Sequence, residues 1–367
     1  MGLYWTVFFG TTFATSLAEK AFNKNRFKRG VLFSIIAIMI ISLYAGARAE
    51  TVGIDVSYYV TPYINRVSWF SSAKDYFIGL PIEPLFGLIT YINGAYFSTP
   101  FFSLFVIELL IVTPLYLLIY KYRKSLSMTF SMIVFLLIVY NMTLCIMRQG
   151  VCTSFILLAF FSDDYSKMKK CLLYIVAVLF HYIGIVFIAM LYVIKWIVEA
   201  KYRNIFKILG VISSILILIM LPSIISLLAG ALGGAFVKYY GTFISADKSG
   251  NNISILEFGL RSVLILLPLF IAEKSKLNKK TSEICYFAVY SIVLSLAAVF
   301  AVYLIRISYF FTYIIVLSLP ASARQFRKRN NKIIYCLLMI ILCFVYWYII
   351  YNIWNYFGIF PYELYYN

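Results

Sequence analysis

Long apolar runs separated by short polar loops repeat along the whole chain of 367 residues. A helix rises about 1.5 Å per residue, so a run of roughly 20 apolar residues is long enough to cross a bilayer. The pattern therefore predicts an all-α polytopic membrane protein with about 11–12 transmembrane helices plus short embedded or re-entrant helices. We expect residues 1–367 to form a single integral membrane domain.

The composition supports the membrane class. Hydrophobic residues make up 63% of the sequence, charged residues make up 13%, and the mean hydropathy is +0.92. A soluble domain of this length has no way to bury so much apolar surface. The first run, Leu3–Ala18, follows no basic residue and contains no small-residue cleavage site, so we interpret it as a retained span rather than a signal peptide.

The net charge of +18 is concentrated in short loops. Twenty-four of the 32 Lys and Arg residues lie in six of them: Lys20–Arg29, Lys121–Lys124, Lys167–Lys170, Lys195–Lys207, Lys274–Lys280 and Arg324–Lys332. Basic loops between apolar spans mark the cytoplasmic side of a membrane. The charge is therefore interpreted as a topology signal, and nucleic acid is not expected as a partner.

With all six loops inside, the chain crosses the membrane an even number of times between successive loops. The predicted spans are Leu3–Ala18, Val31–Ala47, Phe101–Tyr120, Met128–Met147, Val151–Ser162, Ile208–Leu228, Ile253–Ala272, Ile284–Ile305, Ile307–Ser322 and Ile333–Ile350. Residues 48–100 then form an external or partly embedded segment, and residues 229–252 form an external loop.

The run Cys171–Ile194 allows two interpretations. A single span would put the basic loops before and after it on opposite sides of the membrane, unless one loop is displaced. Two half-membrane helices that turn near His181 would keep both loops inside. Broken helices of this kind are tolerated where they are buried in protein or line a cavity.

Arg148 and Arg306 are each the only charge in an apolar hairpin. An arginine at the centre of a bilayer costs roughly 2.5–3.5 kcal/mol, so it usually faces protein or a watery cavity. The topology places both toward the outer face, together with Arg48 and Arg66. The planar guanidinium donates two hydrogen bonds at once to phosphate. We therefore expect an anion-binding vestibule there, with snorkelling anchors as the alternative.

Glu83 precedes a short apolar stretch, Phe86–Tyr96, and Pro84 is well placed as the first residue of a helix. A helix N-terminus favours a carboxylate, so a plain capping role is one interpretation. The stretch is too short to span a bilayer. The other interpretation is an embedded helix that places Glu83 at the membrane surface beside the vestibule.

Six short motifs occur in an order that is similar to the EpsG/Wzy family of bacterial polysaccharide polymerases. They are Arg48…Gly53-Ile54-Asp55…Tyr59, Glu83-Pro84-Leu85-Phe86, Arg148-Gln149, Phe180-His181, Arg306-Ile307-Ser308-Tyr309-Phe310 and Pro361-Tyr362. The resemblance implies a fold like that of integral-membrane, GT-C-like glycosyltransferases. It also implies oligosaccharide repeat units on undecaprenyl diphosphate as substrates, at the periplasmic face of the bacterial inner membrane.

The implied reaction moves a growing glycan from its lipid diphosphate to the non-reducing end of another lipid-linked unit. Arg148 and Arg306 would stabilise the departing diphosphate without a metal, and Arg48 is the next candidate. The attacking hydroxyl needs a general base within hydrogen-bond reach. Glu83 is the first choice for that base, and Asp55 is an alternative.

The remaining candidates concern substrate binding. His181 is an alternative base or a packing histidine. Gln149 and Tyr309 would bind sugar hydroxyls or phosphate oxygens, and Tyr59 belongs to the outer tyrosines whose rings would stack on sugars.

No cofactor is expected. The sequence has one histidine, and none of its six cysteines has metal-ligand spacing, which excludes a zinc site. The glycines of 230–234 lack the strand and lysine of a nucleotide-phosphate loop. The expected partners are lipid-linked oligosaccharides, the bilayer, and a chain-length regulator and flippase of the same pathway. Glu257 and Arg261 are four residues apart and are predicted to pair.

Two other functions remain open. A flippase for the same lipid-linked glycan predicts an internal duplication and charges spread through a central cavity, and neither is visible in the sequence. A membrane scaffold would leave the lone arginines without a purpose.

Overall fold

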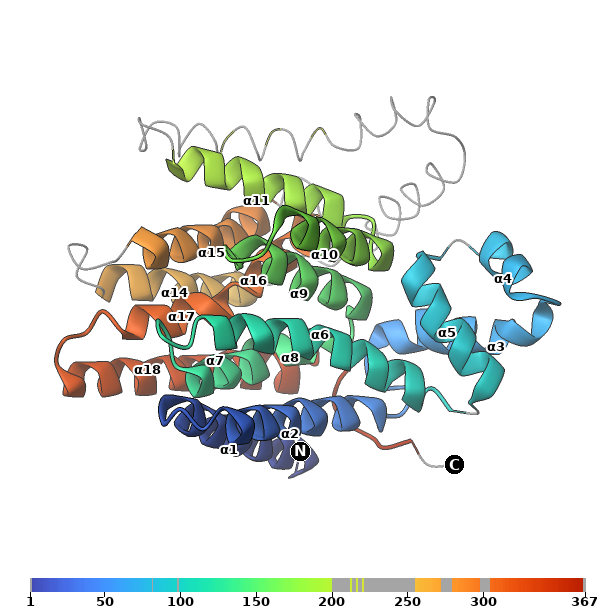
Figure 1. The fold of residues 1–367 in the computed structure, drawn as a ribbon, viewed down its shortest axis with the longest axis horizontal. Coiled ribbons are helices and arrows are strands. Elements are labelled where there is room, and N and C mark those ends of the chain that lie inside the picture. Colours follow the sequence, from blue (N-terminus) through green and yellow to red (C-terminus); the bar gives the residue numbers. More distant parts are fainter. Residues whose placement is uncertain are drawn as a thin grey trace. The chain divides into compact units, whose positions relative to one another are not determined.

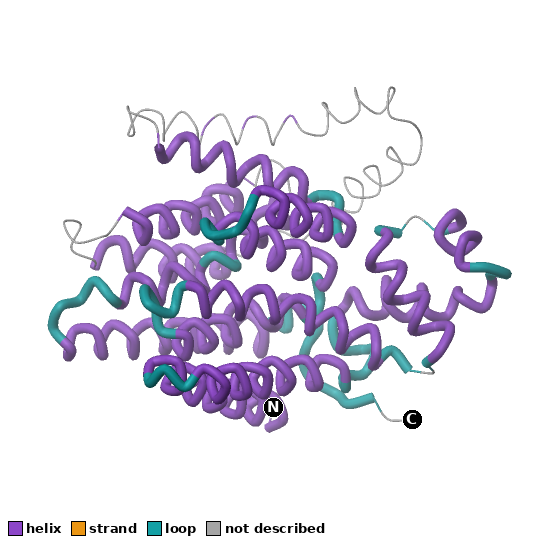
Figure 2. The backbone as a smooth tube through the Cα atoms, viewed as in Figure 1, coloured by secondary structure: helices purple, strands orange, loops and turns teal. Residues whose placement is uncertain are grey.

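The computed structural model of the protein describes residues 2–80, 82–97, 99–199, 255–271, 279–297 and 304–365, together with positions 212, 216 and 220. Within these residues the regular structure is helical, and no strand occurs (Figures 1 and 2). The predicted all-α fold is therefore confirmed. Apart from those three positions, the expected span Ile208–Leu228 and the loop 229–252 lie outside the described residues.

The chain divides into two compact units, residues 1–184 with 319–367 and residues 185–318. Each unit is described by itself. The expected organisation as one membrane domain stays a prediction.

The first unit contains a series of long helices that pack on one another in chain order. Helix α1 (Gly2–Asn23) pairs with α2 (Phe27–Gly46), and α2 packs on α6 (Phe101–Lys121). Helix α6 contacts α9 (Met147–Phe161), which in turn packs on α10 (Lys167–Phe180). Helix α9 thus lies between two neighbours, and its first turn carries Arg148 (Figure 1).

Two further helical stretches complete this bundle. The first consists of α7 (Met128–Val134), the π-helical turn η3 (Phe135–Val139) and α8 (Tyr140–Thr143), and it packs against α1. The second is α18 (Arg329–Trp347) with the π-helical turn η6 (Tyr348–Ile353), and α18 contacts α7 and η3. Helix α17 (Ile315–Ala323) precedes α18.

Residues 48–100 form short helices rather than a span. They are η1 (Val56–Val60), α3 (Thr61–Asn65), η2 (Arg66–Trp69), α4 (Ala73–Gly79) and α5 (Pro84–Tyr96). The predicted short helix after Glu83 is confirmed as α5, with Pro84 at its first position. Helix α5 packs on α3, α6 and α10, which brings this segment against the bundle of the first unit.

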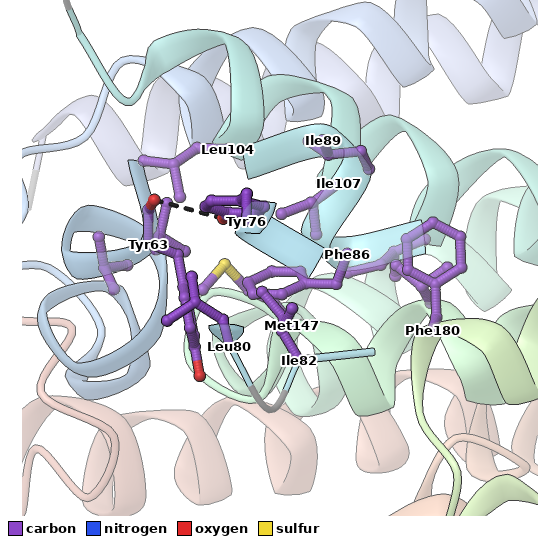
Figure 3. Packing of buried hydrophobic residues seen from close by; sticks show 14 residues of the cluster. Tyr63, Tyr76, Leu80, Ile82, Phe86, Ile89, Leu104, Ile107, Met147 and Phe180 are labelled. Carbon is purple, nitrogen blue, oxygen red and sulfur yellow. Dashed lines mark hydrogen bonds between the residues drawn. The ribbon is translucent and has the colours of Figure 1, made fainter. Parts of the chain in front are cut away.

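An apolar cluster joins these short helices to the bundle. It includes Tyr63, Tyr76 and Phe86 from the segment, Met147 from α9 and Phe180 from α10 (Figure 3). The Tyr76 hydroxyl donates to the carbonyl of Tyr63 at 3.3 Å. The beginning of α9 and the end of α10 are therefore anchored in the same core as α5.

The second unit contains α11 (Gly184–Glu199), α14 (Ile255–Ile271), α15 (Lys279–Ala297) and α16 (Leu304–Thr312). Helix α15 packs on both α14 and α16.

Local polar residues fix where helices begin. Ser72, Ser127 and Ser166 are the N-cap residues of α4, α7 and α10, and each side chain accepts a backbone N–H of the first turn. At α7 the Glu19 carboxylate of α1 also accepts the N–H groups of Met128 and Thr129, at 3.1 and 2.9 Å. An anion at this position complements the helix dipole.

The protein is a multi-pass membrane protein. Four helical stretches in the described part of the chain are long and apolar enough to cross a bilayer: Phe27–Gly46, Phe101–Lys121, Ile305–Ala323 and Arg329–Ile353. Shorter apolar helices accompany them. The total of 11–12 spans stays a prediction.

The run Cys171–Ile194 is broken as one of the two interpretations predicts. Helix α10 ends at Phe180, His181 is its C-cap, and α11 begins at Gly184. The break near His181 is confirmed, whereas the side of the membrane to which each half returns stays a prediction.

Candidate active site

The centre of the site is the carboxylate of Glu83. Glu83 is the N-cap residue of α5, yet its side chain caps no backbone N–H of that helix. Its Oε2 accepts a hydrogen bond from Nη1 of Arg148 at 2.7 Å, and its Oε1 lies 3.0 Å from Nδ1 of His181. The side chain of Glu83 is 0% exposed. The carboxylate is therefore bound on both sides by cationic or ionisable groups instead of serving the helix end.

Arg148 is held by aromatic rings as well as by Glu83. Its guanidinium carbon lies 4.1 Å from the ring centroid of Tyr59 and 5.4 Å from that of Phe86. Such cation–π contacts contribute about 0.5–2 kcal/mol each, more where water is excluded. With its side chain 15% exposed, Arg148 is pre-positioned and only narrowly open to solvent.

His181 is held by its backbone as well as by Glu83. Its N–H donates to the carbonyl of Ala177 at 3.1 Å, and its carbonyl accepts from the amide of Gly184 and from the thiol of Cys152. A Cβ on Gly184 would lie 2.4 Å from the sulfur of Cys152, so any other residue there would force the thiol away from its present position against the turn. The imidazole is 12% exposed.

This arrangement sets the proton positions of the imidazole. A carboxylate accepts only, so in the neutral ring the proton lies on Nδ1 and faces Glu83. The lone pair then lies on Nε2, which becomes the basic atom. If Nε2 takes up a proton, the adjacent anion of Glu83 stabilises the imidazolium that forms.

Tyr63 also responds to this charge pair. Burial raises the pKa of the Tyr63 phenol, the positive charge of Arg148 lowers it, and the Glu83 carboxylate raises it. The phenol therefore lies within electrostatic reach of both groups, on the side of the site formed by α3.

Four residues predicted from sequence lie together here: Glu83, Arg148, His181 and Tyr59. Gln149 is buried in the first turn of α9, next to Arg148. Asp55 is the N-cap residue of η1 and is partly buried.

Arg48 is fully buried, unlike an arginine that lines an open vestibule. It donates to the backbone carbonyls of Ala45 at 2.8 Å and Leu144 at 3.1 Å. Its expected contact with substrate stays a prediction.

Arg306 and Tyr309 belong to the second unit. Arg306 is exposed in the first turn of α16, and Tyr309 is buried. The ring of Tyr309 lies 5.2 Å from the guanidinium of Arg261, which donates to the hydroxyls of Ser295 and Ser308 at 2.9 and 3.1 Å. The predicted pair of Glu257 and Arg261 is confirmed. The structure does not relate these residues to the site in the first unit.

Sequence reasoning missed two parts of this site. Phe86 was quoted only as part of the Glu83-Pro84-Leu85-Phe86 motif, and its cation–π contact with Arg148 was not predicted. The direct contact between Glu83 and His181 joins residues 98 positions apart, and no local pattern announces it. Among the described residues, no group of three or more His, Cys, Asp or Glu side chains is placed to hold a metal ion.

The EpsG family model matches residues 31–364, nearly the whole chain. The protein belongs to the EpsG family. Its role is accordingly that of a glycosyltransferase-type polymerase in polysaccharide biosynthesis. Comparison with curated proteins and with solved structures finds no match to the chain.

Proposed function

We propose that this EpsG family protein transfers a growing glycan from a polyprenyl diphosphate to a sugar hydroxyl of a second lipid-linked repeat unit. The reaction takes place at the periplasmic face of the bacterial inner membrane, with undecaprenyl diphosphate as the carrier, and needs neither metal nor nucleotide. One observation carries the proposal: a fully buried carboxylate, Glu83, joins Arg148 to His181.

The surroundings of this site suit a lipid-linked substrate. Large apolar side chains of the 48–100 segment are strongly exposed: Tyr58, Trp69, Ile78 and Tyr96. Tyrosine and tryptophan favour the headgroup level of a bilayer. A segment anchored at that level places the site where the diphosphate and first sugars of a lipid-linked glycan lie.

The chemical step follows from the proton positions. The acceptor hydroxyl oxygen attacks the anomeric carbon of the donor glycan, and the bond from that carbon to the diphosphate oxygen breaks. Nε2 of His181 takes the hydroxyl proton, and Glu83 stabilises the resulting imidazolium. The polyprenyl diphosphate leaves with the electron pair of the broken bond. General base catalysis of this kind contributes about 10²–10⁴-fold.

Arg148 serves the leaving group. Its fork of five N–H donors matches a phosphate as well as a carboxylate, and Tyr59 and Phe86 hold its plane fixed. A donor already oriented where negative charge develops costs no reorganisation during the reaction. The geometry favours Glu83 as the residue that orients His181 and Arg148, and His181 as the base.

The test uses purified protein in vesicles with synthetic polyprenyl-diphosphate-linked repeat units and no nucleotide. We expect a ladder of longer glycans that survives EDTA and that forms about 10²–10⁴-fold more slowly in His181→Ala. His181→Ala protein that is folded and forms the same ladder at the wild-type rate would overturn the assignment of the base. A ladder that requires an added nucleotide sugar would overturn the proposed donor.

The same vesicles separate the polymerase from a flippase. A flippase moves the lipid-linked unit across the bilayer and leaves its glycan length unchanged. Transport of the repeat unit without any longer product would therefore contradict the proposal.

A further inference from the structure

The short junction between α8 and α9, residues 144–146, leads directly to Met147 and Arg148. We propose that Arg48 is a positioning residue for Arg148. Arg48 acts by binding this junction. Arg48 is itself held in place because residues 47–54 pair with the closing segment 357–365, and we call this pairing the clasp. The inference rests on the proposed function and assigns a role to motifs that the chemistry of the site leaves unused.

Arg48 binds the first residue of the junction and the residue that directly follows it. Its Nη2 donates to the carbonyl of Leu144 and to the sulfur of Met147, each at 3.1 Å, and its Nη1 holds the carbonyl of Ala45 at the end of α2. Leu144 is the C-cap residue of α8, and Met147 is the first residue of α9. One guanidinium thus ties α2 to the end of one helix and the start of the next.

Arg48 does this from a fully enclosed position. Its side chain is 0% exposed, so it offers no surface to a substrate. A buried arginine whose two Nη atoms bind backbone carbonyls fixes geometry, because its planar fork accepts few arrangements of acceptors.

Gly53 lies close to the same carbonyl oxygen of Leu144 that Arg48 binds. Its φ is +90°, and a Cβ there would lie 2.3 Å from the carbonyl oxygen of Leu144. Only glycine combines this backbone conformation with such a close approach. The neighbouring amides of Ile54 and Asp55 lie against the thiol of Cys145, the next residue of the junction.

The closing segment holds residues 47–54 in place. Ala49 donates to the carbonyl of Glu363, and Tyr365 donates to that of Ala47, both at 2.9 Å. Farther along, the amide of Gly53 donates to the carbonyl of Gly358 at 2.8 Å. These bonds run antiparallel, so the end of the chain pairs with the strip that carries Arg48 and Gly53.

Tyr362 strengthens this pairing at the end of α2. Its ring stacks on Tyr44 with centroids 3.9 Å apart, and its hydroxyl donates to the carbonyl of Tyr44. The Pro361-Tyr362 motif therefore serves the clasp.

Helix α6 contacts Thr143, the residue that directly precedes the junction. The hydroxyl of Thr143, the last residue of α8, contacts Oε1 of Glu108 at 3.0 Å, and Glu108 is buried in α6. Thr143, Leu144 and Met147 are thus held by two separate elements, α6 and residues 47–54, and Arg148 follows with little freedom.

This arrangement makes a kinetic prediction. Loosening the junction shifts Arg148 relative to the leaving diphosphate, and a displacement of about 1 Å can cost 10²-fold in rate. Substrate affinity depends on other contacts and changes little. A residue that only holds the bound substrate, with equal strength before and during the reaction, would show the reverse pattern of a higher KM at unchanged kcat.

The test measures kcat and KM of Arg48→Lys in the vesicle assay with lipid-linked repeat units. Lysine keeps the positive charge, but its single ammonium cannot reach the carbonyls of Ala45 and Leu144 in the same geometry. We expect kcat to fall about 10–100-fold with KM within about twofold of wild type. A KM increase at unchanged kcat would show that Arg48 binds substrate and would overturn the inference, as would kinetics equal to wild type.

Tyr362→Phe provides a variant that keeps the stacked ring and removes only one hydrogen bond of the clasp. We expect a smaller fall in kcat, again at constant KM, in protein whose melting temperature matches wild type. If Arg48→Lys fails to fold, an unchanged kcat in Tyr362→Phe overturns the clasp. Lys121→Met, a cation of the basic loop paired with Asp164, is the control and keeps wild-type kinetics.

These outcomes stand apart from the proposed function. Wild-type protein that forms no ladder refutes the proposed donor and acceptor. A wild-type ladder with unchanged kcat in both clasp variants refutes the positioning role alone.

Discussion

Glu83→Gln changes the charge at the centre of the site while it keeps the volume of the side chain. The carboxylate is 0% exposed, and its partners Arg148 and His181 are 15% and 12% exposed, so solvent screens these contacts little. The amide still offers one carbonyl oxygen, which can accept from one partner. The variant therefore loses one charge-assisted hydrogen bond and weakens the other.

The magnitude follows from typical values for such bonds. A hydrogen bond to a charged group contributes about 1.5–3 kcal/mol, and a neutral one contributes about 1 kcal/mol. Losing one and halving the other removes about 3 kcal/mol of transition-state stabilisation. At 1.36 kcal/mol per tenfold change, kcat falls about 100-fold.

The assay is the rate of glycan elongation by purified protein in vesicles, with folding followed by the melting temperature in detergent. Glu199→Gln, which makes the same chemical change at an exposed position of α11, is the matched control and keeps the wild-type rate. Folded Glu83→Gln protein with a rate within threefold of wild type would refute the assignment of Glu83 to the reaction.

Three further perturbations test separate parts of the site. Arg148→Lys loses the planar fork and is expected to lower kcat about 10²-fold. Arg123→Lys, in the basic loop, is expected to leave kcat unchanged. Equal effects of the two substitutions in the elongation assay would contradict a specific role for Arg148. Tyr59→Phe keeps the ring under the guanidinium and retains the wild-type rate. Tyr59→Leu loses the cation–π contact with Arg148, about 1 kcal/mol, and the rate falls about fivefold. A large loss of rate in the phenylalanine variant would show that the hydroxyl matters instead. His181→Gln removes the fall in rate on acidification that protonation of the imidazole causes in wild type, and a pH–rate profile with the same acidic limb in that variant would exclude His181 as the base.

The helices and their approximate boundaries were accessible from sequence because bilayer thickness and backbone hydrogen bonding leave few choices. The predicted runs Val31–Ala47 and Phe101–Tyr120 correspond to α2 and α6 within a few residues. The distribution of the basic loops also predicted the break at His181 as one of two interpretations, because an unbroken helix would have put two of these loops on opposite sides of the membrane. The features that could be predicted are thus the helices and their breaks, because bilayer thickness and charge distribution determine them.

The contacts of the site depend on tertiary packing that no local pattern encodes. A helix start with a carboxylate and a proline suggested capping for Glu83, but the carboxylate binds Arg148 and His181 and caps no backbone N–H group of α5. Likewise, Arg48 carried the sequence signature of an anion-binding residue, although its acceptors are carbonyls of residues 45 and 144. Whether Arg306 acts with Arg148 stays a prediction.

The central claim is that Glu83 and His181 act as one unit in glycan transfer. A double-mutant cycle on elongation rates, with Glu83→Gln, His181→Ala and the double variant, tests it most directly. If Glu83 works mainly through His181, Glu83→Gln slows the His181→Ala protein by far less than the roughly 100-fold expected in wild type, because only its contact with Arg148 is then left to lose. Losses that multiply in the double variant would show that the two residues act independently and would contradict the account.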